Sequence, residues 1–144
     1  MTFAEVNTEI RSLFNTFWAG RTNVYYENEN FDITKQKNGG VKITEYIRLT
    51  IRQLSNEMIG IGSSASGRLK RSNCIVYIDY FFKPNTDIIT INETIDDIIE
   101  AMQNKVLTNG FTYEGDRTPV TRTTNRSFNM VRISINLDYE QLTN

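Results

Sequence analysis

Polar and apolar side chains alternate along residues 45–54, which predicts a strand with one buried and one solvated face. The apolar members are Ile47, Leu49 and Ile51, and the other face carries Tyr46, Arg48, Thr50 and Arg52. A second alternating run occupies 128–137. Residues 74–82 are apolar on both faces apart from Asp79. Strands of that kind are usually central and covered on both sides, so we expect 74–82 in the middle of a sheet.

Two amphipathic stripes predict helices beside these strands. The first follows Thr2 and Glu5, and the second follows Thr90 and Glu93, each pair matching a capping box. Asn109-Gly110 is expected to stop the second helix. The apolar positions recur at helical spacing; they are Phe3, Val6, Ile10, Leu13, Phe14 and Phe17, then Ile91, Ile95, Ile98, Ile99, Met102 and Val106.

Shorter runs complete the expected order of elements. Residues 24–26 and 111–113 read as short strands, 57–62 as a short edge strand, and 114–126 as a loop or a distorted hairpin arm. The order is therefore α-β-β-(β)-β-α-β-β. Strands that come in runs favour an α+β fold, with an antiparallel or mixed sheet of about four to six strands packed with two main helices. A chain of 144 residues fits a single domain over 1–144.

The residue inventory excludes several kinds of chemistry. The chain has no histidine and one cysteine, Cys74, so Ser-His-Asp and Cys-His catalytic sets and cysteine-based zinc sites are excluded. Asp79 is expected to form an ion pair with an arginine. Gly60-x-Gly62 lacks the spacing of a phosphate-binding loop and is interpreted as a turn or bulge. We therefore expect no enzymatic activity, no cofactor and no metal.

Charge and hydropathy limit the partners. The net charge is −1, which does not favour general binding to nucleic acid. No apolar run is long enough to span a membrane. Charged residues are nevertheless segregated: the acids are Glu93, Asp96, Asp97 and Glu100 on the second helix, and the basic groups are Arg68, Lys70 and Arg71, then Arg117, Arg122 and Arg126.

These charges carry two interpretations. The acids fit a solvated helix face, and the basic residues fit an ordinary charged surface. The sharper hypothesis is a subunit interface in which one basic group meets the acids of a neighbouring copy; pairing within one subunit is the other possibility. The polar stretch 27–42 is expected to be a docking loop, with Asn28, Asn30, Lys35 and Lys37 as its contact residues.

An ordered set of segments spans roughly residues 1–115. It consists of Phe17-Trp18, the run Thr22–Phe31 with its hydrophobic-x-x-Asn-x-x-Phe pattern, the strand Tyr46–Ile51, Gly60-Ile61-Gly62, the basic run Arg68–Arg71 leading into Cys74–Phe81, and the helix Thr90–Val106. In this order the segments resemble the tail terminator-like proteins of long-tailed bacteriophages. Two departures are Ser72-Asn73, where a glycine often opens the strand, and Lys83-Pro84-Asn85-Thr86, which lacks a glycine after the proline.

The resemblance implies a virion structural protein of the tail neck, assembled in the host cytoplasm. Such a protein forms a homo-oligomeric ring, usually a hexamer, that caps the tail tube, ends its polymerisation and joins it to the head connector. DNA passes through the lumen without being read. The resemblance implies no cofactor.

Three alternatives stay open. The two departures leave room for a related head-tail connector or neck completion protein. A nucleic-acid-binding module would need the basic groups to merge on one face. A small carboxylate enzyme would need Asp79 or the helix acids to converge in a pocket.

Overall fold

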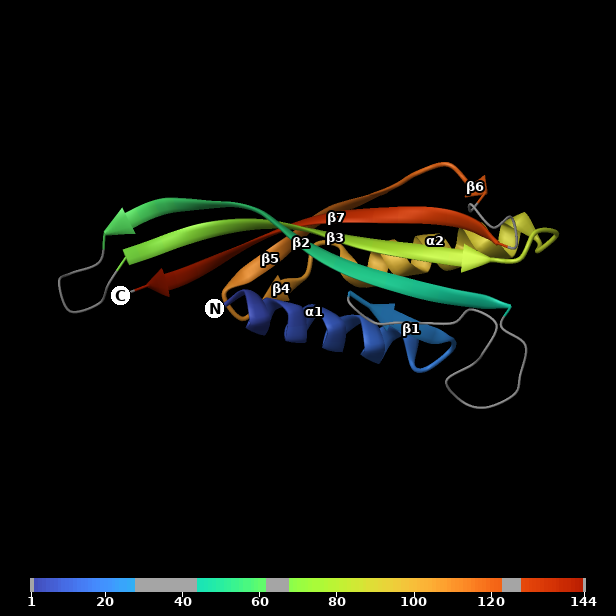
Figure 1. Ribbon diagram of the computed structural model, residues 1–144, viewed down its shortest axis with the longest axis horizontal. Helices are drawn as coiled ribbons and strands as arrows, with labels where there is room; N and C mark the ends of the chain where they lie inside the picture. The colour runs from blue at the N-terminus through green and yellow to red at the C-terminus, as the bar shows by residue number, and fades with distance from the viewer. Residues whose placement is uncertain (1, 28–43, 62–67, 123–127, 144) are drawn as a thin grey trace.

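One mixed sheet with both helices on the same side organises the chain (Figure 1). The computed structural model describes residues 2–27, 44–61, 68–122 and 128–143. Its elements in order are α1 (Phe3–Trp18), β1 (Asn23–Tyr26), β2 (Glu45–Ile61), β3 (Arg68–Phe82), α2 (Ile88–Met102), β4 (Val106–Leu107), β5 (Gly110–Arg117), β6 (Thr121–Arg122) and β7 (Asn129–Thr143).

The sheet has seven strands within the described ranges, in the order β1-β2-β3-β7-β5-β4, with β6 also pairing with β7. β1 runs parallel to β2, and all other pairs are antiparallel. The expected α+β class, with a mixed sheet and two helices, is confirmed. The strand number exceeds the expected four to six because the two-residue strands β4 and β6 carry too short a pattern to be recognised.

The predicted edge strand over 57–62 is right in type and position, because residues 57–61 are extended and pair only with β3 among the described residues, but it is not a separate strand. Residues 57–61 continue β2, which pairs with β3 along almost its whole length. Two register shifts, between Gln53 and Ser55 and between Met58 and Gly60, interrupt the alternation there. Such irregularities break the period of two, and this explains why the sequence pattern suggested two strands instead of one. Gly60 lies at the second shift, as the bulge interpretation expected.

The first helix begins as expected and the second does not. The backbone N–H of Glu5 donates to the Thr2 hydroxyl at 3.2 Å, and the Thr2 N–H donates to the Glu5 carboxylate at 3.3 Å. In α2 the N-cap is Asp87, whose carboxylate accepts from the Ile89 N–H at 3.2 Å. Thr90 therefore lies inside the first turn, and the capping box predicted there is wrong.

The second helix also ends earlier than Asn109-Gly110 suggested. It stops at Met102, whose carbonyl accepts from the Thr112 hydroxyl at 2.7 Å. The same hydroxyl accepts from the Lys105 N–H at 2.8 Å. Thr112, from β5, therefore satisfies backbone groups at the end of the helix, and the chain turns into β4 instead of adding another turn. Val106, expected on the apolar helical stripe, lies on β4 and is 88% exposed.

The main core lies between the helices and one face of the sheet. It combines the buried residues of α1 and α2 with inward-facing residues of β2, β3 and β7; among the fully buried side chains are Ile10, Phe14, Ile47, Ile78, Tyr80, Ile95, Ile98 and Ile133. β3 lies between β2 and β7, so its predicted central position is confirmed. The predicted cover on both faces is wrong, because both helices lie on the same face.

β2, β3 and β7 are much longer than their neighbours. At one end of the molecule they extend beyond α1, β4 and β5 (Figure 1). Within the described residues, no helix is both long and apolar enough to cross a bilayer.

Candidate functional site

The sheet face opposite the helices carries polar side chains from three long strands. We call it the open face; its residues are Arg48, Thr50 and Arg52 from β2, Ile75, Tyr77 and Asp79 from β3, and Arg132, Ser134 and Asn136 from β7. Strand alternation places these residues on one side, because Ile47, Ile78 and Ile133 point into the main core. The register aligns Arg48, Asp79 and Arg132 in one row across three strands.

Asp79 and Arg132 form a two-bond ion pair within this row. Nε of Arg132 donates to Oδ1 at 2.8 Å and Nη2 donates to Oδ2 at 3.2 Å. The guanidinium also lies 4.4 Å from the centre of the Tyr77 ring. The hydrogen bond to Asp79 raises the pKa of Arg132 above its usual value. The expected ion pair is confirmed, and both carboxylate oxygens of Asp79 are engaged, as in a structural pair.

An aromatic cluster closes one end of the open face. Tyr46 and Phe81 stack with ring centres 4.3 Å apart, while Tyr25 and Phe128 meet Tyr46 edge-on. All four side chains are buried, although no helix covers them. Burial, with a further contribution from Tyr25, raises the pKa of Tyr46 to about 12. The cluster explains how β3 is apolar on both faces without a second helical layer.

The remaining charges of the open face along β2 are positive. Arg48 and Arg52 are exposed, and neither forms an ion pair with another described residue. Asp79 is paired with Arg132, so two guanidinium groups remain along β2, whereas Asp116 of β5 and Asp138 of β7 lie on the same side of the sheet at its other edge. This alternation was visible in the sequence, but the sequence alone did not show that both helices lie on the opposite side of the sheet.

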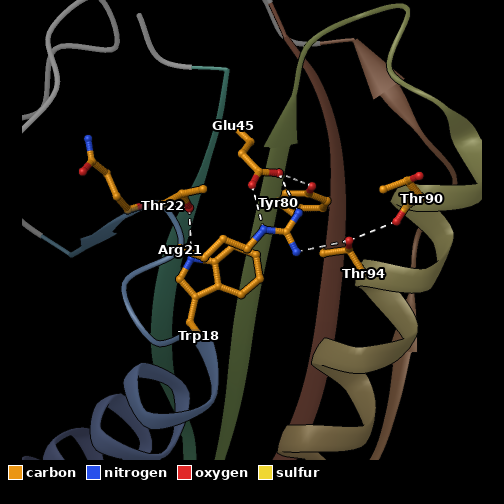
Figure 2. A network of polar contacts seen from close by, with 8 residues as sticks. Trp18, Arg21, Thr22, Glu45, Tyr80, Thr90 and Thr94 are labelled. Atoms are coloured by element: carbon orange, nitrogen blue, oxygen red, sulfur yellow. Dashed lines mark hydrogen bonds and ion pairs between the residues drawn. The ribbon is translucent and has the colours of Figure 1, made fainter. Parts of the chain in front are cut away.

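A polar network on the helix side of the sheet joins four elements of the fold (Figure 2). Arg21 follows α1 and pairs with Glu45 at the start of β2, with Nε–Oε1 2.8 Å and Nη2–Oε2 3.2 Å. The Tyr80 hydroxyl donates to the same carboxylate at 2.5 Å. Nη1 of Arg21 lies 3.5 Å from the Thr94 hydroxyl of α2. Burial, followed by the hydrogen bond to Glu45, raises the pKa of Tyr80.

The network borders a hollow of about 530 Å³ between α1, β1 and the start of β2. The Arg21 guanidinium lies 4.9 Å from the centre of the Trp18 ring, and the Trp18 indole N–H donates to Thr22 at 2.9 Å. The charged groups at its wall, Arg21 and Glu45, are thus engaged with other protein groups. We interpret the network as a clamp that fixes α1 and α2 against β2 and β3. Sequence reasoning missed it because its members are far apart along the chain.

The predicted interface acids lie on α2 facing away from the sheet. Glu93, Asp96, Asp97 and Glu100 are all exposed, while Ile95 and Ile98 between them are buried. In the described parts of the chain, no cluster of three or more acidic or cysteine side chains is arranged to hold a metal ion.

The predicted basic groups are not brought together. Arg68, Lys70 and Arg71 begin β3, at the end of the molecule opposite β6 (Figure 1). Arg71 lies 4.0 Å from Glu140. Arg117 donates to Asn92 of α2 at 3.1 Å, and Arg122 is exposed on β6. Arg126 and the docking-loop residues Asn28, Asn30, Lys35 and Lys37 lie outside the described residues.

Comparison with known proteins identifies the fold and no family. No family model matches the chain, and no curated protein matches it. A solved structure whose name carries no functional information matches with a TM-score of 0.58 at 12% identity, over 96% of this chain and 97% of the other. The whole α+β arrangement therefore recurs in another protein, and at this identity the likeness concerns the fold alone.

Proposed function

We propose that this chain is a virion structural protein of a long-tailed bacteriophage, a tail terminator that assembles with copies of itself into a ring. In this role the ring, usually of six subunits in the proteins it resembles, caps the tail tube, ends its polymerisation and meets the head connector. DNA passes through its lumen. The proposal rests on the ordered set of segments described above, from Phe17-Trp18 to the second helix.

One structural observation supports assembly in particular. The two sides of the sheet differ, because both helices lie on one side and the other presents a strand face that no helix covers within the described residues, with a positively charged line along β2. A closed ring requires a heterologous contact, in which two different surfaces of each subunit meet. A two-layer subunit with unlike sides offers such a pair of surfaces.

Native mass spectrometry and negative-stain electron microscopy of the purified chain test the assembly. We expect a discrete oligomer of about six subunits with a central hole, by analogy with closed cyclic assemblies. A chain that stays monomeric from micromolar to submillimolar concentration at low salt would contradict the proposal.

A genetic experiment separates a terminator from a connector. In the phage that encodes this chain, removal of a terminator should give tails of excessive and variable length, because nothing ends polymerisation. Removal of a connector should instead leave tails of normal length that are not joined to heads. Tails of normal length would exclude the terminator role.

A further inference from the structure

The exposed side of α2 carries a regular stripe of apolar and acidic residues. Ile89, Glu93, Asp96 and Glu100 follow at spacings of four, three and four, so they lie along one line of the helix, with Asp97 beside it. Ile89 is 63% exposed, so it offers an apolar contact at the start of the stripe. None of the four acids forms an ion pair with another described residue.

The open face carries a complementary line along β2. Leu54 is 54% exposed and borders a hollow of about 380 Å³ with Asn73, Tyr113 and Asn136. Arg52 and Arg48 follow it on the same side of the strand. Both lines therefore run from an apolar end to a charged end, and the charges have opposite sign.

We propose that the acidic stripe of α2 docks on the open face of a second copy of this chain, with Arg48 and Arg52 as its main charge partners. This inference rests on the proposed ring and names its interface. Arg48 and Arg52 replace the two basic groups that the sequence predicted as partners of the acids. The group at Arg68–Arg71 lies at the far end of the molecule (Figure 1), and Arg117 of the other group donates to Asn92 on α2 of the same chain.

The spacings of the two lines differ by only about 3 Å. Glu93 and Glu100 are about 10 Å apart along the helix axis at 1.5 Å per residue. Arg48 and Arg52 are about 13 Å apart along their strand. Arginine and glutamate side chains are long enough to close the difference. Placed in this register, Ile89 lies toward Leu54 and the hollow beside it.

This contact is heterologous by construction. The helix side of one copy meets the strand side of the next, so each copy keeps one free surface of each kind until a ring closes. Exposed ion pairs are weak singly, and a contact of this kind therefore needs several pairs together with an apolar part. It also weakens as salt screens the charges.

Charge reversal on both sides tests the proposal. The first variant is Arg48→Glu with Arg52→Glu, and the second is Asp96→Lys with Asp97→Lys. Each should weaken assembly by about 100-fold or more, since attraction becomes repulsion at several positions. Assembly is measured by mass photometry and analytical ultracentrifugation, with circular dichroism to verify that each variant is folded.

Mixing the two reversed variants gives the sharpest result. Each variant alone should be monomeric, whereas an equimolar mixture should assemble, because every contact in an alternating ring then pairs opposite charges. The variant that combines all four substitutions should assemble as well. Arg117→Glu with Arg122→Glu is the matched control and should assemble like the wild type.

The outcomes separate the interface from the ring. A wild-type chain that never assembles refutes both proposals. If the wild type assembles and Arg48→Glu with Arg52→Glu assembles equally well, the ring stands and this interface is wrong. Loss of assembly in the Arg117 and Arg122 control alone would point to the end of β5 and to β6 as the partner of the acids.

Discussion

The carboxylate of Glu45 is the shared partner of a buried hydroxyl and a half-exposed guanidinium, which makes its contribution measurable. Tyr80 is fully buried and donates to Glu45 at 2.5 Å. Arg21 binds the same group with a side chain that is 43% exposed. The two interactions should therefore contribute unequally to the free energy of unfolding.

Tyr80→Phe removes only the hydroxyl. A hydrogen bond to a charged group contributes about 1.5–3 kcal/mol, and since Arg21 still satisfies Glu45 we expect a loss of about 1.5–2 kcal/mol. Glu45→Ala leaves the buried hydroxyl without its acceptor, at about 1–3 kcal/mol, and removes an ion pair that contributes about 0–1 kcal/mol at this exposure. We therefore expect a loss of about 2–3 kcal/mol from Glu45→Ala.

The double variant decides whether the hydroxyl and the carboxylate are coupled. Glu45→Ala should lower the free energy of unfolding less in the Tyr80→Phe background than in the wild type, because no hydroxyl is then left unsatisfied. The difference should be about 1 kcal/mol or more. Urea unfolding followed by circular dichroism at low protein concentration measures all four proteins. Tyr77→Phe is the control, since its ring contact with Arg132 survives loss of the hydroxyl. An equal cost of Glu45→Ala in both backgrounds would refute the reasoning.

Three further predictions concern the core and the open face. Ile98→Ala should lower the free energy of unfolding by about 2–5 kcal/mol because Ile98 is fully buried, and the half-buried Ile99 should lose clearly less; equal melting temperatures would contradict this. The pKa of Tyr46 is about 12 in the folded chain and about 10 in the unfolded chain. The contribution of the neutral hydroxyl to the free energy of unfolding is therefore complete below pH 10 and is lost as pH rises through 12. Tyr46→Phe should remove about 2–3 kcal/mol of that alkaline loss, measured by urea titrations between pH 9 and pH 12. Arg132→Met should cost about 3 kcal/mol in urea unfolding by leaving the buried Asp79 carboxylate unpaired, and adding Asp79→Asn should recover much of it; no recovery would mean that the guanidinium acts through packing.

Local patterns predicted the elements that depend on local physics. The capping box at Thr2 and the alternation of buried Ile47 and Leu49 with exposed Arg48 need only nearby residues, and both are present in the structure. The cap at Asp87 was missed because Thr90 and Glu93 offer a capping spacing three residues later. In the structure the helix is capped by Asp87, whose carboxylate accepts from the Ile89 N–H and the Thr90 hydroxyl of the first turn.

Pairings between distant segments could not be predicted in this way. The sequence indicated that Asp79 needs an arginine, but only the register of β3 and β7 selects Arg132. The clamp of Arg21, Glu45 and Tyr80 has no sequence pattern at all, because its residues come from a turn and two strands that meet only in the folded chain. The open face could be predicted only in part. The alternation predicted its polar residues, whereas the position of both helices on the other side is a property of the whole fold.

The position of β7 has a consequence for synthesis. It is the last strand in the sequence, yet it lies between β3 and β5 and contributes Val131, Ile133, Ile135 and Leu137 to the main core. During synthesis, β3 and β5 therefore cannot be joined into one sheet until β7 has emerged from the ribosome, because each of them pairs with β7. A nascent chain cannot complete either side of its sheet before then, so self-association through a finished sheet is deferred until β7 has been made. Truncation within β7 should consequently be far more damaging than its late place in the sequence suggests.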